Sequence, residues 1–305
     1  MLKLSALAGA LAGIMMAACV QAAGTEAANT PAEVPAPVSE GVTNKEYKKG
    51  PVIKVASYNI AAARVSSLDS VTMAIKAIDA DVIALNEVDN KTARAGGVDQ
   101  AKYIAEKLGL QYAFGPAIDF EGGKYGIAVL SRYPITSYEV VNLPQGEPGV
   151  DEDRVVLAVE INHEKFDTPV VILNTHLDYK EDHVLQRKQI ATINDIAVAN
   201  VSLKQIRDVT TKVKILMGDF NDTGNSDNIA ELSRYWDLVT LQDRYRMRTW
   251  PSANPMADLD HIFTSRGQRW TLKSLTIPKG KEMGIDWASV SDHLPVIAVM
   301  TLYER

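Results

Sequence analysis

Polar side chains that can bind cations or move protons stand at the ends of short apolar runs in this chain. Glu87 follows the run Val-Ile-Ala-Leu-Asn, and His176 ends the run Val-Ile-Leu-Asn-Thr-His. In layered α/β folds, strand ends bring distant segments together on one surface. The full candidate set contains carboxylates, amides and imidazoles: Asn59, Glu87, His176, Asp219, Asn221, Asp260, Asp292 and His293.

These residue types indicate which cofactor the site would take. Carboxylate and amide oxygens without cysteine suit a hard cation such as Mg²⁺ or Mn²⁺. A zinc site would require more histidine or cysteine at close spacing, and no His-Glu-x-x-His pattern occurs. The chain also lacks a Gly-x-x-x-x-Gly-Lys loop and a Gly-x-Ser-x-Gly turn, which argues against a nucleotide-triphosphate loop and a serine hydrolase.

Seven short motifs that contain these residues resemble, in order, those of the endonuclease/exonuclease/phosphatase superfamily over residues 52–300. This superfamily includes pancreatic deoxyribonuclease, abasic-site endonucleases, inositol-polyphosphate phosphatases and bacterial sphingomyelinases. Each motif is weak evidence alone, but seven in the right order make coincidence implausible. They are Ser57-Tyr58-Asn59-Ile60, Leu85-Asn86-Glu87-Val88, Gly126-Ile127-Ala128-Val129-Leu130-Ser131-Arg132, Asn174-Thr175-His176-Leu177, Gly218-Asp219-Phe220-Asn221, Leu259-Asp260-His261-Ile262-Phe263 and Ser291-Asp292-His293-Leu294-Pro295.

The resemblance implies an α/β fold, a four-layer α/β sandwich in which two packed mixed β-sheets are flanked by helices. It also implies hydrolysis of a phosphodiester or phosphomonoester by in-line attack of water, dependent on Mg²⁺ or Mn²⁺. One residue departs from the family pattern: Asn86 stands where the family commonly has Gln before the metal-binding Glu. The shorter amide is expected to change a contact beside the metal, while Glu87 itself is kept.

The resemblance also implies a role for each residue at the metal and at the attacking water. Glu87 is expected to be the main metal ligand, with Asn59 and Asp292 ligating the ion or supporting its ligands. His293 would act as general base on the water or bind the phosphate, and Asp260 would orient its ring. Whether one or two metal ions bind stays open.

The other three candidate residues would act on the substrate. Asp219 is an alternative proton acceptor to His293, and the sequence does not decide between them. Asn221 would orient water and donate a hydrogen bond to the developing phosphorane. His176 would donate a hydrogen bond to a nonbridging phosphate oxygen.

The hydrophobic pattern places these residues on alternating strands and helices. We expect helices at about 68–78, capped by Ser66-Ser67, at 99–108 and at 182–199. We expect one catalytic domain over residues 51–305, because the candidate residues span most of it. The predicted strands lie at about 52–58, 81–85, 112–114, 126–130, 136–141, 154–161, 170–173, 213–217, 259–263 and 294–300.

The N-terminal segment predicts export. Residues 1–22 resemble a signal peptide, with Lys3 followed by an apolar run and a small-residue cleavage site at Val20-Gln21-Ala22. A lipoprotein-type cleavage before Cys19, the only cysteine, is the alternative, and it would give a lipid anchor. Residues 23–50, rich in Ala, Pro and Glu, are expected to form a flexible linker. The location would be the periplasm, an outer-membrane tether or the medium.

The net charge of the chain helps to distinguish nucleic acids from smaller phosphoesters as substrates. The formal net charge is −6, and removal of the leader, whose only charged residue is Lys3, makes it more negative. Proteins that bind nucleic acid nonspecifically usually carry the opposite sign. We therefore expect a small or lipid-linked phosphoester as substrate, with an extracytoplasmic DNA or RNA endonuclease as the alternative and a noncatalytic binding module as a weaker third. The only expected membrane contact is the lipid anchor, and the protein is expected to be a monomer.

A few further residues could contact substrate or serve the fold. Tyr125 and Trp250 could line a substrate wall or simply pack. Arg132 and Arg154 could meet phosphate, although a strand-edge ion pair is the favoured interpretation of each. Substrate choice is expected to reside in the loops 91–98, 145–153 and 221–228. We interpret Asp89, Asp178 and Asp222 as turn or cap residues, and His163, His183 and His261 as surface or structural residues.

Overall fold

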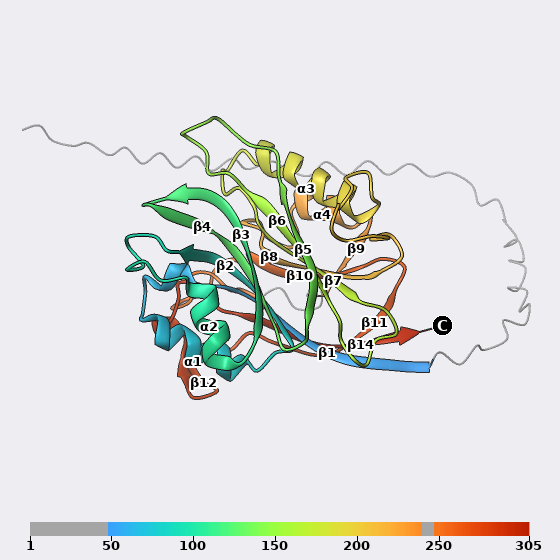
Figure 1. Cartoon of the computed structure of the whole chain (residues 1–305), viewed down its shortest axis with the longest axis horizontal. Coiled ribbons are helices and arrows are strands. Elements are labelled where there is room, and N and C mark those ends of the chain that lie inside the picture. The colour runs from blue at the N-terminus through green and yellow to red at the C-terminus, as the bar shows by residue number, and fades with distance from the viewer. Residues whose placement is uncertain (1–47, 240–246, 305) are drawn as a thin grey trace, which may run out of the picture. The chain divides into compact units, whose positions relative to one another are not determined.

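Two six-stranded mixed β-sheets face each other in the computed structural model, which describes residues 48–239 and 247–304. Helices α1 and α2 cover the outer face of one sheet, and α3 and α4 cover the outer face of the other (Figure 1). The predicted four-layer α/β sandwich is therefore confirmed. Its elements are β1 (Lys48–Asn59), η1 (Ala61–Ala63), α1 (Leu68–Ile78), β2 (Val82–Asn90), α2 (Gln100–Leu108), β3 (Gln111–Phe120), β4 (Gly123–Ser131), β5 (Ile135–Asn142), β6 (Val155–Ile161), β7 (Val170–His176), α3 (Val184–Ala197), β8 (Val213–Asp219), α4 (Asp227–Leu232), β9 (Trp236–Leu238), β10 (Asp260–Ser265), β11 (Arg269–Thr276), β12 (Lys281–Glu282), β13 (Ile285–Asp286), η2 (Trp287–Ser289) and β14 (Val296–Glu304).

The two sheets share one plan of strand order and direction. The first runs β11-β14-β1-β2-β4-β3, and the second runs β5-β6-β7-β8-β10-β9. Each has one parallel pair near its centre, β1 with β2 and β7 with β8, and its other neighbours are antiparallel. Because both strands of a parallel pair end at the same edge, each pair delivers two strand ends to one place.

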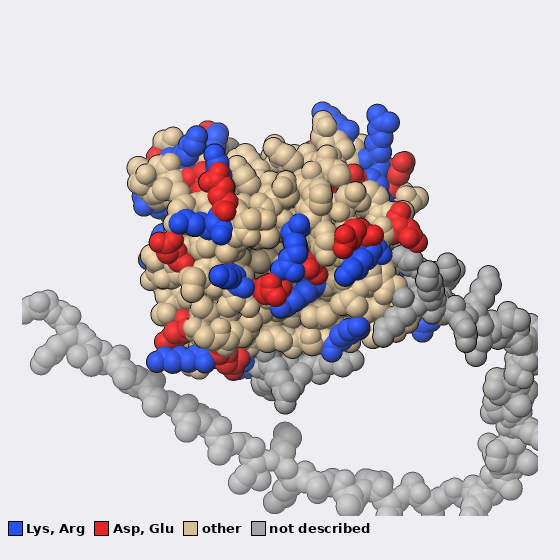
Figure 2. Space-filling model, turned by 60° about the horizontal axis from the view of Figure 1, so that its bottom comes forward, with Lys and Arg blue, Asp and Glu red and all other residues tan. Residues whose placement is uncertain are grey.

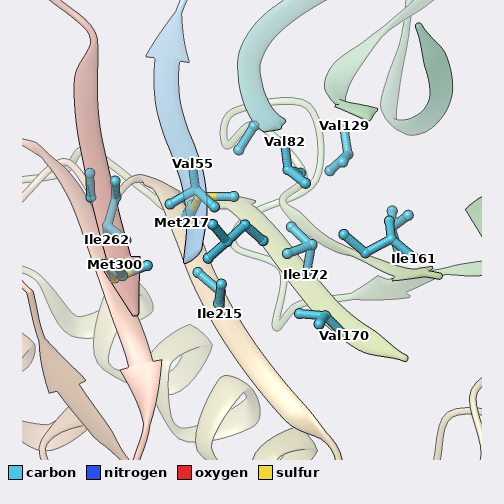
Figure 3. Close-up of a cluster of buried hydrophobic side chains, with 14 of the residues drawn as sticks. Val55, Val82, Val129, Ile161, Val170, Ile172, Ile215, Met217, Ile262 and Met300 are labelled. Carbon is cyan, nitrogen blue, oxygen red and sulfur yellow. The ribbon is translucent and has the colours of Figure 1, made fainter. Parts of the chain in front are cut away.

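The main core lies between the sheets and is built from β-branched and aliphatic side chains (Figure 3). Val55 and Val82 of the first sheet meet Ile172 and Ile215 of the second, and all four side chains are fully buried. Two further clusters lie between each sheet and its helices. Strands β2, β7 and β8 are buried on both faces, which explains why their sequences are continuous apolar runs rather than alternating ones.

Local sequence sets the ends of the two helices that cover the first sheet. The side chain of Ser67 accepts a hydrogen bond from Ser70 N and begins α1, and Asp99 does the same for α2 through Lys102 N. Helix α2 ends at Gly109 in the left-handed conformation. The predictions for α1 and α2 are thus confirmed to within a residue.

Several elements differ from the sequence prediction. Strand β1 begins at Lys48, so Lys48 and Lys49 of the predicted linker pair with β14 instead of remaining free. Strands β9, β11, β12 and β13 and the six-residue helix α4 were missed. Strand β11 is mostly exposed, so its sequence lacks the apolar alternation that marks a strand. The predicted signal peptide, Cys19 and most of the linker lie outside the described residues.

The described residues belong to a single compact unit, Lys45–Arg305. Within the described ranges, every helix falls short of the length and apolar character that a bilayer crossing requires.

Gly218, just before Asp219, lies where β8 leaves no room for a side chain against β7. Its φ of 148° is a conformation that only glycine adopts easily, and a Cβ atom built there would lie 1.9 Å from the carbonyl oxygen of Thr175. A side chain at this position would therefore push apart the two strand ends that carry His176 and Asp219.

We expect Gly218→Ala to lower the free energy of unfolding by about 3 kcal/mol, because backbone strain and a clash act together. Urea denaturation measures this. Gly96→Ala is the matched control, since Gly96 also has a positive φ but open space around it, and it should lose only about 1 kcal/mol. Equal losses in the two variants would show that the close approach of β7 and β8 is not the constraint.

Candidate active site

The candidate residues gather at one end of the sandwich because the strand registers align them. Asn59 is paired with Asn86 across β1 and β2, which places Glu87 next to this edge. In the other sheet, His176 is paired with Asp219 across β7 and β8, and Asp260 is paired with Asp219 across β8 and β10. Residues far apart in sequence thus share one surface.

A bulge in β2 directs Glu87 to this end. The register between β2 and β4 shifts between Leu85 and Val88, and Glu87 has a φ of 54°. Bulges change the direction of a side chain at a sheet edge, and a non-glycine residue with positive φ is uncommon. The bulge brings the Glu87 carboxylate within 3.1 Å of the Asn59 amide nitrogen, and Arg64 donates to its second oxygen at 3.0 Å.

Asp219 is the hub of the site. Its Oδ2 accepts a hydrogen bond from Asn59 Nδ2 at 3.0 Å, and it lies 3.6 Å from His293 Nε2 and 3.7 Å from His176 Nε2. Its Oδ1 accepts from the backbone N–H of Asn221 at 2.9 Å. Asp219 is 1% exposed, so these donors replace the water that a carboxylate would otherwise hold. The carboxylate therefore holds residues from both sheets in fixed relation.

His293 lies between carboxylates. Its Nδ1 is 2.8 Å from Asp260 Oδ2, and its Nε2 faces Asp219. Burial alone would lower the pKa of His293, but the carboxylates of Asp260, Asp219 and Asp292 outweigh it and raise the pKa to about 10. Burial, with the nearby Asp260 carboxylate, raises the pKa of Asp219 to about 6, although His293 opposes the shift.

His176 is in the opposite electrostatic state. Burial lowers its pKa well below the ordinary value, and the positive charges of Arg154 and His293 lower it further. Arg154 Nη1 lies 3.0 Å from His176 Nδ1, and a guanidinium can only donate, so Nδ1 must accept. The ring proton then sits on Nε2, which points toward Asp219 as a donor. The predicted role of His176 as a donor to phosphate requires this tautomer.

The Asn86 departure has a structural explanation, because this amide bridges the two sheets. Asn86 Nδ2 donates to Thr175 O at 2.7 Å and to Asn174 Oδ1 at 3.2 Å, while its Oδ1 accepts from Asp219 N at 3.1 Å. Asn174 in turn donates to Leu85 O and to a second carbonyl of the first sheet. Asn86 therefore supports the backbone of Asp219 directly, from the strand that also carries Glu87.

These residues line a cavity of about 350 Å³ that opens to the surface. Six of the eight predicted residues line it, and the other two, Asn59 and Asp260, stand behind them with hydrogen bonds to Asp219 and His293. The lining residues are Glu87, Tyr125, Glu152, Arg154, His176, Tyr179, Asp219, Asn221, Trp250, Leu259, Asp292 and His293.

The lining also contains residues that the sequence did not single out. Glu152 and Tyr179 were missed, and no spacing signal marks either one. Trp250 and Arg154 do line the cavity, which agrees with the less favoured interpretation of Arg154, although it also forms an ion pair with Glu152. Tyr125 lines it as well. Of the three predicted specificity loops, 145–153 and 221–228 contribute lining residues, and 91–98 contributes none.

Other polar residues serve the fold. The buried Asp89 forms an ion pair with the more exposed Arg94, and Arg132 pairs with Asp79 and Asp81 away from the cavity. His261 Nε2 lies 2.9 Å from the Asp222 carbonyl oxygen. In the same way, His163 packs on Tyr133 and Phe166, Asp178 accepts from Lys180 N, and His183 lies against Asp222.

The donor set fits a hard cation. Asp219, Asp260 and His293 each offer a ligand atom within 4.8 Å of the others. Glu87 and the exposed Asp292 line the open part of the same cavity. Of the two roles predicted for Asn59, the geometry fits support of the metal ligands and not direct binding of the ion. Its Oδ1 accepts from Ala61 N, and its amide NH₂ donates to Glu87 and Asp219. In this geometry it orients the carboxylates.

A protein-family model described as the endonuclease/exonuclease/phosphatase family matches residues 56–293, a range that contains all of these residues. The chain belongs to this family, whose members are phosphoesterases. The resemblance predicted from the seven motifs is confirmed.

Other proteins resemble this chain in sequence or in fold. Uncharacterized protein YbhP of Escherichia coli (strain K12) is 24% identical over 239 residues, which cover 75% of this chain and 86% of the relative. The human nocturnin catalytic domain, solved with a bound sulfate anion, superimposes with a TM-score of 0.62 at 18% identity, over 84% of this chain and 95% of that one. Bacteroides thetaiotaomicron VPI-5482 mannosyl-6-phosphatase Bt3783 gives a TM-score of 0.58 at 16% identity, over 81% and 99%.

The raised pKa of His293 predicts how the free energy of unfolding depends on pH. A histidine whose pKa rises on folding stabilises the fold fully below its unfolded pKa of about 6.5, and the stabilisation is lost as pH rises toward about 10. Asp260→Asn removes the nearest carboxylate while keeping a hydrogen-bond acceptor. We expect the loss of unfolding free energy in Asp260→Asn, relative to wild type, to be larger near pH 6 than near pH 9.5.

Urea denaturation of the metal-free proteins measures this difference. Other groups also titrate in this range; for example, burial lowers the pKa of Lys214 to about 8. Their contributions cancel when the unfolding free energy of the variant is subtracted from that of the wild type. A difference that does not change with pH would contradict the electrostatic pairing of His293 with Asp260.

Proposed function

We propose that this protein is a divalent-metal-dependent phosphoesterase that hydrolyses a small or lipid-linked phosphoester by in-line attack of water. The observation that supports it most is the environment of Asp219. One buried carboxylate oxygen lies 3.6 and 3.7 Å from two imidazole nitrogens and accepts from Asn59, at the base of an open cavity. An array of this kind can position water and stabilise charge at phosphorus.

Glu87 and Asp292 would hold Mg²⁺ or Mn²⁺ at the open side of the cavity. When bound, such an ion neutralises the phosphate and stabilises the leaving oxygen. Asn59 holds the Glu87 carboxylate in place, and Arg64 binds its other oxygen. The chain thus orients this acid before any ligand arrives.

The remaining residues divide the chemistry of the water and the phosphate. Asp219 is proposed as the proton acceptor, because its Oδ2 lies beside His293 at the cavity base while His293, whose pKa the flanking carboxylates raise to about 10, already holds its proton near neutral pH. His293 and the Nε2–H of His176 would bind nonbridging phosphate oxygens. Asn221 lines the cavity with its amide donating to Leu177 O, which fixes its orientation at the wall where the attacking water would bind.

Surface charge supports a small substrate over duplex nucleic acid. Figure 2 shows a face on which basic and acidic side chains are interspersed. The overall charge is also negative. The mannosyl-6-phosphatase neighbour acts, by its name, on a sugar phosphate, and a compact polar substrate of similar size suits a cavity of about 350 Å³. An exported monomer, free or held by a lipid on Cys19, remains our proposal for where and how it works.

We expect a chelator to abolish hydrolysis and Mg²⁺ or Mn²⁺ to restore it, because the carboxylates alone repel phosphate. The measurement is turnover of a panel containing bis-p-nitrophenyl phosphate, sugar and inositol phosphates, sphingomyelin, RNA and plasmid DNA. Preferred cleavage of plasmid DNA would favour the nuclease alternative. Full activity after exhaustive chelation would contradict metal dependence.

We expect Glu87→Gln and His293→Gln each to reduce kcat/KM by about a hundredfold or more, because each removes charge at the reacting phosphate. Thermal unfolding should show both variants folded. Glu106→Gln is the control for Glu87→Gln, since it makes the same charge change on an exposed side chain of α2 outside the cavity, and it should keep wild-type activity. Wild-type turnover by Glu87→Gln would refute the proposed site.

A further inference from the structure

The charge balance of the cavity distinguishes between two kinds of phosphoester. Four of its lining residues are carboxylates, Glu87, Glu152, Asp219 and Asp292, while Arg154 is the only lysine or arginine among the described residues that line it. A phosphomonoester carries close to two negative charges near neutral pH, because its second pKa is about 6. A phosphodiester carries one. Because Arg64 already pairs with Glu87 and the divalent ion would be shared by both kinds of ester, a second negative charge on the substrate is favoured only where the chain leaves a further cation free.

The one guanidinium is already neutralised by the chain itself. Arg154 is 3% exposed, and its Nη2 forms an ion pair with Glu152 Oε2 at 2.8 Å. Its Nη1 donates to His176. The other cationic group of the lining, His293, is held between Asp260 and Asp219. Both cations therefore already have carboxylate partners within the chain. Neither is free to balance the second negative charge of a phosphomonoester.

The cavity rim offers a place for a second ester group. Tyr179 follows β7 and is 65% exposed, and Trp250 precedes β10 and is 41% exposed. Both line the cavity, and because β7 and β10 flank β8, they come from either side of the strand that carries Asp219. Exposed aromatic faces favour contact with an uncharged substituent over contact with a second phosphate charge.

We propose that the site selects a monoanionic phosphodiester over a dianionic phosphomonoester, and that Glu152 sets this preference by neutralising Arg154. The inference rests on the proposed phosphoesterase function and specifies its substrate class. Glu152 is placed as a specificity residue: it touches Arg154 at the cavity wall and takes no part in the proton transfer.

Two substrates that differ by one methyl group test the proposal. Methyl p-nitrophenyl phosphate is a monoanionic diester, and p-nitrophenyl phosphate is a dianion at about pH 8, with the same leaving group. For the wild type, kcat/KM should favour the diester by about tenfold or more. Glu152→Gln keeps an oxygen that Arg154 can bind but frees its charge, and it should reduce this diester-to-monoester ratio by about fivefold to tenfold.

A binding measurement separates recognition from chemistry. With the metal-loaded enzyme at about pH 8, competitive inhibition by inorganic phosphate, a dianion, and by dimethyl phosphate, a monoanion, should show that Glu152→Gln strengthens binding of the dianion more than that of the monoanion. Glu106→Gln, with the same charge change on α2, should leave both the ratio and the affinities at wild-type values.

The outcomes also separate the two proposals. A wild-type preference for the monoester, or an unchanged ratio in Glu152→Gln, would overturn the charge-selection inference and leave the phosphoesterase function standing. Hydrolysis of neither ester with any divalent ion tested would contradict the proposed function, and the inference would fall with it.

Discussion

A buried carboxylate must be surrounded by hydrogen-bond donors, and the rest of this structure depends on how that requirement is met for Asp219. Its carboxylate accepts hydrogen bonds from Asn59 of β1 and from the backbone of the loop after β8, and its own backbone N–H donates to Asn86 of β2. The two sheets must therefore stack in one register for the charge to be tolerated. Loss of that register would leave the carboxylate without partners, so the same interactions that stabilise the fold also define the geometry of the site.

Two asparagine amides connect this constraint to the core. Asn86 reaches from the first sheet to the Thr175 carbonyl, and Asn174 reaches back from the second sheet to carbonyls of β2 and β4. The aliphatic core between the sheets is not directional, so it can hold the sheets together without fixing their offset. The amide pairs are directional and fully buried, and they set the offset at the end where the catalytic chemistry is proposed.

The two histidines of the site have different protonation states because they contact different charged groups. His293 faces carboxylates on both ring nitrogens and has a raised pKa, while His176 faces a guanidinium and has a lowered one. One ring is therefore poised as a cation and the other as a neutral donor, within reach of the same Asp219 oxygen. The substrate charge that the cavity tolerates follows from the same pairing logic, extended to Arg154 and Glu152.

The sequence by itself determined the strand ends that carry His176 and Asp219, the caps of α1 and α2, and the oxygen-rich character of the site. It also marked Glu87, although β2 continues past this residue to Asn90 and does not end before it. These features are local, because apolar runs and capping residues act over a few positions. Only the tertiary structure decided the positive φ of Glu87, the ring tautomer of His176 and the presence of Glu152 at the cavity wall. Those features depend on which residue of the other sheet or loop a side chain contacts. The hydrophobic periodicity of the sequence carries no information about such long-range contacts. The same reason explains why β11 escaped prediction: its pairing with β14 holds it in place, while its own side chains are mostly exposed.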